Sequence, residues 1–396
     1  MPICAHPAPR RLASVLVTAS LLALIGAAFP AHGQAMVKVN DNVNFKLGFL
    51  IQPQADWTET INATGDGSNG FQQNLFIRRL RFLIGGQVAK NLFFFAETEN
   101  LNLGKSTQTV AGGAGGKSPG TGFALLDAVG EWRLAKEFNI QFGELRSPVS
   151  REGLKSSPNQ FMLDLSAYAF LTSTALQNQS GRDTGVMFRG WFLCDRLEYR
   201  SAILGGARLP GVKNSPRFAN RLQYNFFDTE VYNMPSYAGV NYGNKKILAI
   251  GGAYDTQGDY RFASADMYLD FPVPVGSFES TIQYQYANGG TFLTALPEES
   301  TFQIEAGAYF KKLKIAPIAR YEQKTFTQAV NEYKNENRFA FGLNYYPYTK
   351  SESNFNIKFW WQRVTVKCAS AANPCPASSS NFITDQVTIQ MQAYYF

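Results

Sequence analysis

The stretch from Val43 to Trp57, VNFKLGFLIQPQADW, decides the fold. Its odd positions are all apolar, and its even positions carry the polar side chains, among them Lys46 and Asp56. A period of two indicates a β-strand with one apolar face and one polar face. The alternation lasts for 15 residues, whereas a soluble strand has about 5 or 6 residues and a strand tilted across a bilayer needs about 9 to 11. The stretch therefore predicts a membrane-spanning strand.

The same alternation recurs along the rest of the sequence. We expect strands that start near residues 43, 74, 92, 123, 138, 182, 197, 217, 246, 260, 276, 301, 314, 336, 354 and 382. A barrel that is apolar outside and polar inside satisfies every backbone group without leaving an edge. Roughly sixteen strands enclose an aqueous channel. The sequence predicts an all-β fold, a transmembrane antiparallel β-barrel of about 16 strands, as a single domain over residues 36–396.

Residues 1–35 predict a secretory signal peptide. Two arginines precede an apolar stretch from Leu12 to Phe29, and small residues follow it. Cleavage after Gly33 and cleavage after Ala35 fit equally well. The apolar stretch is also long enough for an uncleaved membrane anchor, which is the alternative.

The composition excludes several classes of function. The formal net charge is +7, and without Arg10 and Arg11 of the predicted signal peptide 35 basic residues stand against 30 acidic ones, an excess too mild to indicate a nucleic-acid partner. The only two histidines, His6 and His32, lie in the predicted signal peptide. The remaining chain has no imidazole for acid–base catalysis or for binding a metal. We therefore predict that the protein is not an enzyme and that it needs no cofactor and no metal.

Two cysteines near the end of the sequence are a disulfide candidate. Cys368 and Cys375 flank six residues rich in Ala, Ser, Asn and Pro, a composition typical of a loop. An oxidising compartment would favour a bridge between them. Because spacing alone does not fix the geometry, two free thiols are the alternative.

One connection is much longer than the others. It runs from Arg146 to Gly181, about 35 residues, and loops of this length are usually functional. Its first part contains Arg146, Arg151 and Lys155. Because a guanidinium group can grip phosphate oxygens with two parallel hydrogen bonds, we expect an anion-selective constriction here.

Arginines on the lumen face of the strands extend this candidate anion site. They are Arg79, Arg81, Arg189, Arg200, Arg217 and Arg221. The last four come from three consecutive strands and could form a basic stripe. For each of them the alternative is an ion pair with an acid of the wall, which would brace the barrel instead of binding a solute.

Two features do not fit a regular barrel. The connection from Asp228 to Lys245 has about eighteen residues where a short turn is expected. It indicates either a missed pair of strands or a turn with structure of its own. In addition, Phe396 follows the last apolar residue, Tyr395, directly and so breaks the alternation by one. A final Phe on an aromatic strand resembles the assembly signal of outer-membrane barrels.

Several stretches resemble the phosphate-selective porin O/P family. They are Phe76 to Phe82 (FIRRLRF), Leu126 to Trp132 (LDAVGEW), Phe142 to Ser157 (FGELRSPVSREGLKSS), Gly181 to Gly190 (GRDTGVMFRG), Leu197 to Gly205 (LEYRSAILG), Arg221 to Glu230 (RLQYNFFDTE) and Gly243 to Gly251 (GNKKILAIG). The resemblance implies a trimeric passive pore of the Gram-negative outer membrane. It also implies a third external loop that folds into the pore and favours anions such as phosphate.

The sequence departs from the family pattern near the expected constriction. The departures are at Val129, at Glu144 to Arg146 and at Asp164-Leu165. They favour a mildly anion-preferring pore over a strongly phosphate-selective one. The alternatives are a general or sugar-permeable porin and, in another class, a barrel hydrolase or a structural barrel. The expected partners are small anions or other small solutes, outer-membrane lipid and two further copies of the chain.

Overall fold

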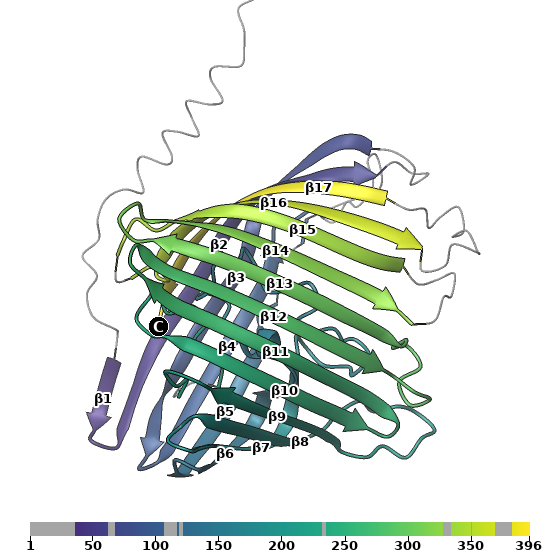
Figure 1. The fold of residues 1–396 in the computed structure, drawn as a ribbon. Helices are drawn as coiled ribbons and strands as arrows, with labels where there is room; N and C mark the ends of the chain where they lie inside the picture. Colours follow the sequence, from purple (N-terminus) through teal and green to yellow (C-terminus); the bar gives the residue numbers. More distant parts are fainter. Residues whose placement is uncertain are drawn as a thin grey trace, which may run out of the picture. The chain divides into compact units, whose positions relative to one another are not determined.

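The computed structural model describes residues 36–61, 68–106, 117–118, 122–231, 235–327, 334–349, 351–368 and 382–396. Within these ranges, sixteen long antiparallel strands form a barrel, which closes because β17 pairs with β2 (Figure 1). The strands are β2 (Val43–Ile61), β3 (Ser68–Ala89), β4 (Leu92–Leu103), β5 (Ala124–Ala135), β6 (Phe138–Arg146), β7 (Arg182–Phe192), β8 (Leu197–Leu204), β9 (Arg217–Asn225), β10 (Ile247–Gln257), β11 (Tyr260–Val273), β12 (Gly276–Asn288), β13 (Glu299–Phe310), β14 (Ile315–Phe326), β15 (Lys334–Tyr345), β16 (Phe355–Cys368) and β17 (Phe382–Tyr395). A short strand, β1 (Met36–Asn40), pairs with the start of β2.

The predicted barrel is confirmed strand by strand. Fifteen of the sixteen expected starts lie within two residues of the observed ones. The exception is β3, which starts at Ser68 because its first residues pair with the end of β2. Strand β1 was not expected.

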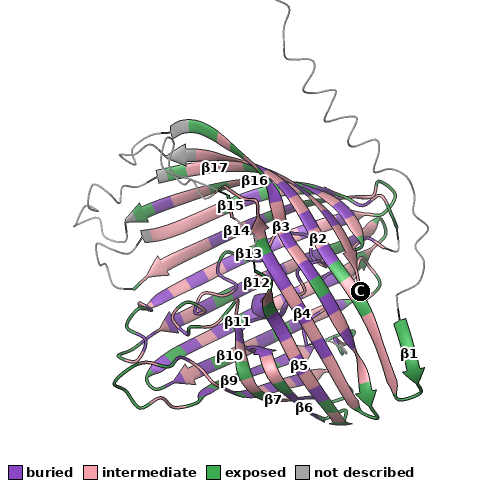
Figure 2. Cartoon of the chain, turned by 180° about the vertical axis from the view of Figure 1, so that it is seen from behind, coloured by how far each residue is buried: buried purple, intermediate pink, exposed green. Residues whose placement is uncertain are grey.

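Burial alternates along the strands as the period of two requires (Figure 2). On the outward face Phe82 is 54% exposed and Leu222 is 59% exposed. Their neighbours on the other face, Arg81 and Arg221, are 4% and 2% exposed. The charged face therefore points into the lumen and the apolar face points outward, as in a barrel that contacts lipid.

Strand β3 contains a β-bulge beside Pro53. Gln52 pairs with Arg79, but the next residue, Pro53, pairs with Ile77. Arg78 is therefore an extra residue with no partner on β2. Proline has no N–H for the ladder and is tolerated in a sheet at such irregular positions. A bulge also changes the direction of side chains, and here it allows the side chains of two successive arginines to reach the same group inside the barrel.

Two segments fold into the barrel. The first inward segment, residues 147–181, connects β6 to β7 and contains the single turn α2 (Arg151–Leu154), which is capped by the Ser150 hydroxyl. The second inward segment connects β9 to β10 and is described over residues 226–231 and 235–246. Because three antiparallel strands lie between them, the two segments enter from opposite ends. Strands β9 and β10 pair directly, so the second segment hides no missed strand pair and has structure of its own.

Some predictions lie outside the described residues. They concern the signal peptide, residues 1–35, and the partner side chain of the disulfide candidate, Cys375; of Cys368 only the backbone is described. Over the ranges that the structure describes, no helical stretch has the length and apolarity to cross a bilayer.

Candidate functional site

The two inward segments meet inside the lumen. Lys155 of the first segment and Tyr237 of the second form a parallel β-bridge. The Tyr237 N–H donates to the Leu154 carbonyl at 2.9 Å, and the Ser156 N–H donates to the Tyr237 carbonyl at 3.1 Å. Further along, the Val240 N–H donates to the first segment at 3.1 Å. Backbone hydrogen bonds thus join a segment from one end of the barrel to a segment from the other.

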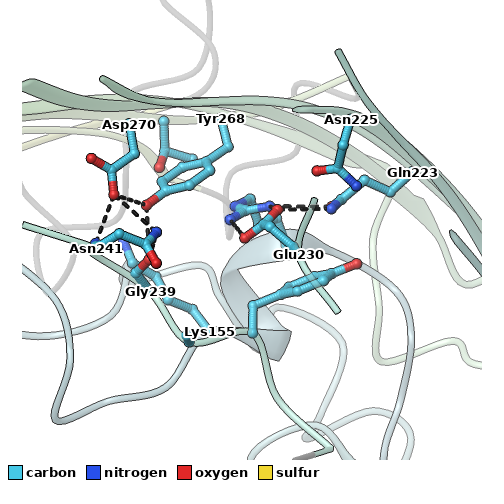
Figure 3. Close-up of polar contacts among 12 residues, drawn as sticks. Lys155, Gln223, Asn225, Glu230, Gly239, Asn241, Tyr268 and Asp270 are labelled. Carbon is cyan, nitrogen blue, oxygen red and sulfur yellow. Dashed lines mark hydrogen bonds and ion pairs between the residues drawn. The ribbon is translucent and has the colours of Figure 1, made fainter. Parts of the chain in front are cut away.

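A buried ion pair fixes this junction. Arg151 donates to both carboxylate oxygens of Glu230, at 2.9 and 2.7 Å, and Gln223 donates to the same carboxylate at 2.9 Å. The guanidinium group lies 3.6 Å from the ring centroid of Tyr268, whose hydroxyl donates to the Gly239 carbonyl at 2.8 Å (Figure 3). Such a pair is stable only while both partners remain, because removing one leaves a buried charge uncompensated.

All nine predicted anion-site residues lie buried in the lumen, and each has a carboxylate partner. The pairs are Arg79–Asp164, Arg81–Glu97 (3.0 Å), Arg146–Asp127 (3.2 Å), Arg151–Glu230 (2.7 Å), Lys155–Glu305, Arg189–Glu131 (2.7 Å), Arg200–Glu198 (2.8 Å), Arg217–Asp255 (2.7 Å) and Arg221–Asp266 (2.6 Å). Each positive charge is therefore partly neutralised before any solute reaches it.

The expected basic stripe is present in part. Arg189, Arg200 and Arg221 occupy directly opposed positions on β7, β8 and β9. Arg217 lies four residues along β9, opposite Leu204, and is not in this row.

The second inward segment covers this row. The ring of Tyr237 lies 4.8 Å from the Arg200 guanidinium and 5.7 Å from that of Arg221. Its hydroxyl donates to Glu198 at 2.8 Å, and Arg200 donates to the Pro235 carbonyl at 2.7 Å. The arginine row therefore contributes to anchoring the segment as well as to the charge of the wall.

Asp164 of the first inward segment is clamped by two successive arginines. Arg78 donates to one carboxylate oxygen through Nε at 2.9 Å and Nη2 at 2.6 Å, and Arg79 donates to the other oxygen. Burial alone would raise the pKa of Asp164, but the two guanidinium groups lower it well below its ordinary value of 3.8. The alternation rule did not predict Arg78 because it places adjacent residues on opposite faces. The two consecutive arginines in FIRRLRF were the available signal, and only the bulge brings them together.

Aromatic rings close the contact between the segments and the wall. Phe161 of the first segment lies 5.6 Å from Tyr242 of the second, and Tyr242 lies 5.6 Å from Tyr309 and 5.5 Å from Tyr346. A side chain on Gly307 would start 2.6 Å from the Phe161 ring, so the glycine makes room for it. This cluster is an apolar anchor for both segments.

Described residues line two cavities at the end of the barrel where short turns join β3 to β4 and β5 to β6. One has a volume of about 240 Å³ and the other about 280 Å³. Both are lined by Glu131 and Arg133. The larger is also lined by Arg189 and Trp191, and the smaller by Lys46, by three phenylalanines of β4 and by Phe396.

Comparison with known proteins agrees with this architecture. Among solved structures, an anion-selective porin from Comamonas acidovorans is similar at TM-score 0.56 with 10% identity, covering 89% of this chain and 99% of that one. The outer membrane channel DcaP of Acinetobacter baumannii is similar at TM-score 0.56 with 11% identity, covering 91% and 99%. The trimer form of OmpT from Vibrio cholerae has TM-score 0.50 with 8% identity, covering 89% and 99%. At these identities the likeness shows the fold.

Comparison of the sequence with curated proteins and with family models gives a match to a family model. No curated protein matches the chain. The model of the family "Phosphate-selective porin O and P" matches residues 49–191, which include the bulge of β3 and the whole first inward segment. The resemblance drawn from the sequence is therefore confirmed over that stretch. The chain is a closed sixteen-stranded antiparallel β-barrel with the fold of outer-membrane porins, and its residues 49–191 match the family "Phosphate-selective porin O and P".

Proposed function

We propose that the protein is a passive, water-filled diffusion channel that favours small anions, phosphate among them. The observation that carries the proposal is the lumen face, which is lined by charged and amide side chains and narrowed by two inward segments. Leaving out Arg10 and Arg11, 35 basic residues stand against 30 acidic ones, so the preference for anions is mild.

Narrowing increases the effect of each charge. Two unit charges 4 Å apart interact by about 1 kcal/mol in bulk water and by about 4 kcal/mol at the lower effective dielectric constant of a protein surface. The first inward segment brings Arg151 and Lys155 together with their carboxylates, Glu230 and Glu305, into this narrower region. The electrostatic field that a passing solute meets therefore depends more on the positions of these pairs than on the total charge of the wall.

Assembly and export are part of the same proposal. The trimer form of one structural neighbour and the resemblance to the porin O/P family support a homotrimer in outer-membrane lipid. Residues 1–35 would be removed during export. Cross-linking in native membranes tests for the trimer, and the mass of the mature amino terminus distinguishes cleavage after Gly33 from cleavage after Ala35.

A general or sugar-permeable porin is the second candidate. It is favoured by the carboxylate partners of all nine predicted anion-site residues and by two tryptophans on the lumen face, Trp191 and Trp360, which are 6% and 4% exposed. In the other class, a barrel hydrolase or a structural barrel would conduct no ions.

Planar bilayer recordings separate these functions. Under a potassium chloride gradient, the proposed channel gives a reversal potential with cation-over-anion permeability below one. Phosphate added to the bath then blocks chloride current saturably if phosphate is bound. A permeability ratio above one contradicts the anion preference and leaves a general pore. Absence of current, or release of fatty acid from phospholipid, contradicts the channel itself.

A further inference from the structure

The ring of Phe396 lies on the lumen side of the barrel. It forms an edge-to-face contact with Phe95 at a centroid distance of 5.7 Å, and the Lys46 ammonium group lies 4.1 Å from its centroid. Both partners belong to the lumen face of their strands. The break in alternation at the end of the sequence therefore turns an aromatic ring inward, away from the lipid-facing side chains of β17.

Two glycines make room for this ring. A side chain on Gly48 would overlap the Tyr395 carbonyl and the Phe396 ring, and one on Gly85 would start 3.1 Å from the Phe396 ring and 3.3 Å from Phe95. Neither glycine has a positive φ. Space for the ring and, at Gly48, for the Tyr395 carbonyl is therefore what these two positions require, and not relief of backbone strain.

The ring forms one wall of the smaller cavity, whose volume is about 240 Å³. Phe93 and Phe95 form further apolar walls. The two cations that line the cavity both rest on aromatic rings, since the Arg133 guanidinium lies 3.6 Å from the Phe93 centroid and Lys46 covers Phe396. The cavity therefore combines flat apolar walls with positive charge.

Little negative charge opposes these cations. Among the described residues that line the cavity, Glu131 is the one acidic side chain. One of its oxygens accepts two hydrogen bonds from Arg189, at 2.9 and 2.7 Å, and the other lies 3.2 Å from Arg133. Glu131 is thus shared between two arginines. No described carboxylate forms an ion pair with Lys46.

We propose that this cavity binds a small organic anion with a flat apolar body, of the aromatic monocarboxylate class. The proposal rests on the proposed function and names a solute class for the channel. The carboxylate of such an anion would lie at Lys46 and Arg133, and its ring would pack on Phe93 and Phe396. Inorganic phosphate would lose hydration against the apolar walls without compensation. A cavity of 240 Å³ is smaller than the roughly 300–1,000 Å³ of sites for drug-sized ligands, which limits the anion to about one ring.

Benzoate, acetate and phosphate are the probes. Each is titrated against chloride current in planar bilayers and, separately, into detergent-solubilised protein by calorimetry. We expect benzoate to block the current saturably and to bind at least tenfold more tightly than acetate. Equal affinity for benzoate and acetate would show that the apolar walls contribute nothing and would overturn the proposal.

Three variants localise the site. Lys46→Met should weaken benzoate binding at least fivefold, and Phe93→Leu should reduce the preference for benzoate over acetate. The matched control is Lys246→Met, because the Lys246 ammonium group also lies over an aromatic ring, 4.2 Å from Phe227, but does not line the cavity. Unchanged benzoate affinity in both cavity variants, or equal loss in the control, overturns the assignment.

The experiments test the binding-site proposal and the channel proposal separately. Chloride current without benzoate binding overturns the site and leaves the channel. Benzoate binding without chloride current overturns the channel and leaves the site. Circular dichroism and heat-modified electrophoretic mobility identify a variant that does not fold, and the other cavity variant then decides the outcome.

Discussion

The lumen holds its cations in two different ways. Around the junction of the inward segments, guanidinium groups bind carboxylates, as Arg151 binds Glu230 at 2.7 Å. In the cavity beside Phe396, Lys46 lies over an aromatic ring and forms no ion pair with a described carboxylate, whereas Arg133 lies over Phe93 and also pairs with Glu131 at 3.2 Å. A paired arginine presents little net charge, and removing its partner is costly, whereas a cation such as Lys46 that lies over a ring without a carboxylate partner keeps its charge available. The location of unneutralised charge, more than the number of basic residues, should therefore set selectivity.

Glu230→Gln should have the largest effect. It leaves Arg151 buried without a counter-charge, which typically costs about 3–5 kcal/mol. The free energy of unfolding from urea titrations in lipid measures this loss. We also expect noisier and larger channel currents, because the second inward segment loses its ion pair with the first.

Two further variants control that experiment. Glu137→Gln removes an exposed carboxylate from a turn and should leave the free energy of unfolding unchanged. Combining Glu230→Gln with Arg151→Met removes the stranded charge and should recover part of the loss. If Glu230→Gln alone were as stable as the wild type, the ion-paired junction would not stabilise the lumen. The difference drawn between the junction and the cavity beside Phe396 would then be wrong.

Asp164→Asn should shift selectivity more than stability. It releases two guanidinium groups, those of Arg78 and Arg79, from their shared carboxylate. A gain of about 1 kcal/mol for an anion near one freed charge corresponds to roughly fivefold in permeability. The reversal potential under a salt gradient measures the ratio. Asp195→Asn, in an ion pair with Lys136 in which the lysine is 55% exposed, is the control and should change it little. An unchanged ratio in Asp164→Asn would show that paired arginines already act on passing anions.

Lys46→Met should cost little stability. Cation–π contacts contribute about 0.5–1 kcal/mol at exposed sites, and Lys46 is only partly buried. The same urea titration that reports the loss in Glu230→Gln measures this smaller one. If both variants lost several kcal/mol, the cavity lysine would be as structural as the junction arginine, and the two regions would not differ as argued.

The period of two determined most of the barrel in advance. It fixed the face of Arg79 and Arg217, and it placed fifteen strand starts within two residues, because register must match one apolar face to lipid. It also showed the irregularity at Phe396, although the position of the ring over Lys46 depends on Gly48 and Gly85, which come from other strands.

Other parts of the site depend on contacts that no local pattern encodes. The docking of Tyr237 on the first inward segment joins residues about eighty positions apart and entering from opposite ends of the barrel. The partner of each lumen arginine depends on which acids the neighbouring strands and segments bring within reach. For Arg217, these are Asp255 of β10 and Asp183 of β7. Alternation predicted that Arg217 faces the lumen, but not which carboxylates it would pair with.

The smallest expected effect concerns pH: the effect of Asp164→Asn on the permeability ratio should not change with pH. Arg78 and Arg79 lower the pKa of Asp164, so its contribution to anchoring is fully present above the ordinary value of 3.8 and is lost only as the pH falls through the lower folded value. The difference in permeability ratio between wild type and Asp164→Asn should therefore stay constant from pH 7 down to pH 3.8. The lumen has many other carboxylates, and this difference isolates Asp164 from them. A carboxyl with the ordinary value would be half protonated at pH 3.8, and the difference would shrink by about half there. Shrinkage of that size would mean that the two arginines are not clamped on Asp164, and that the first inward segment is held by its other contacts alone.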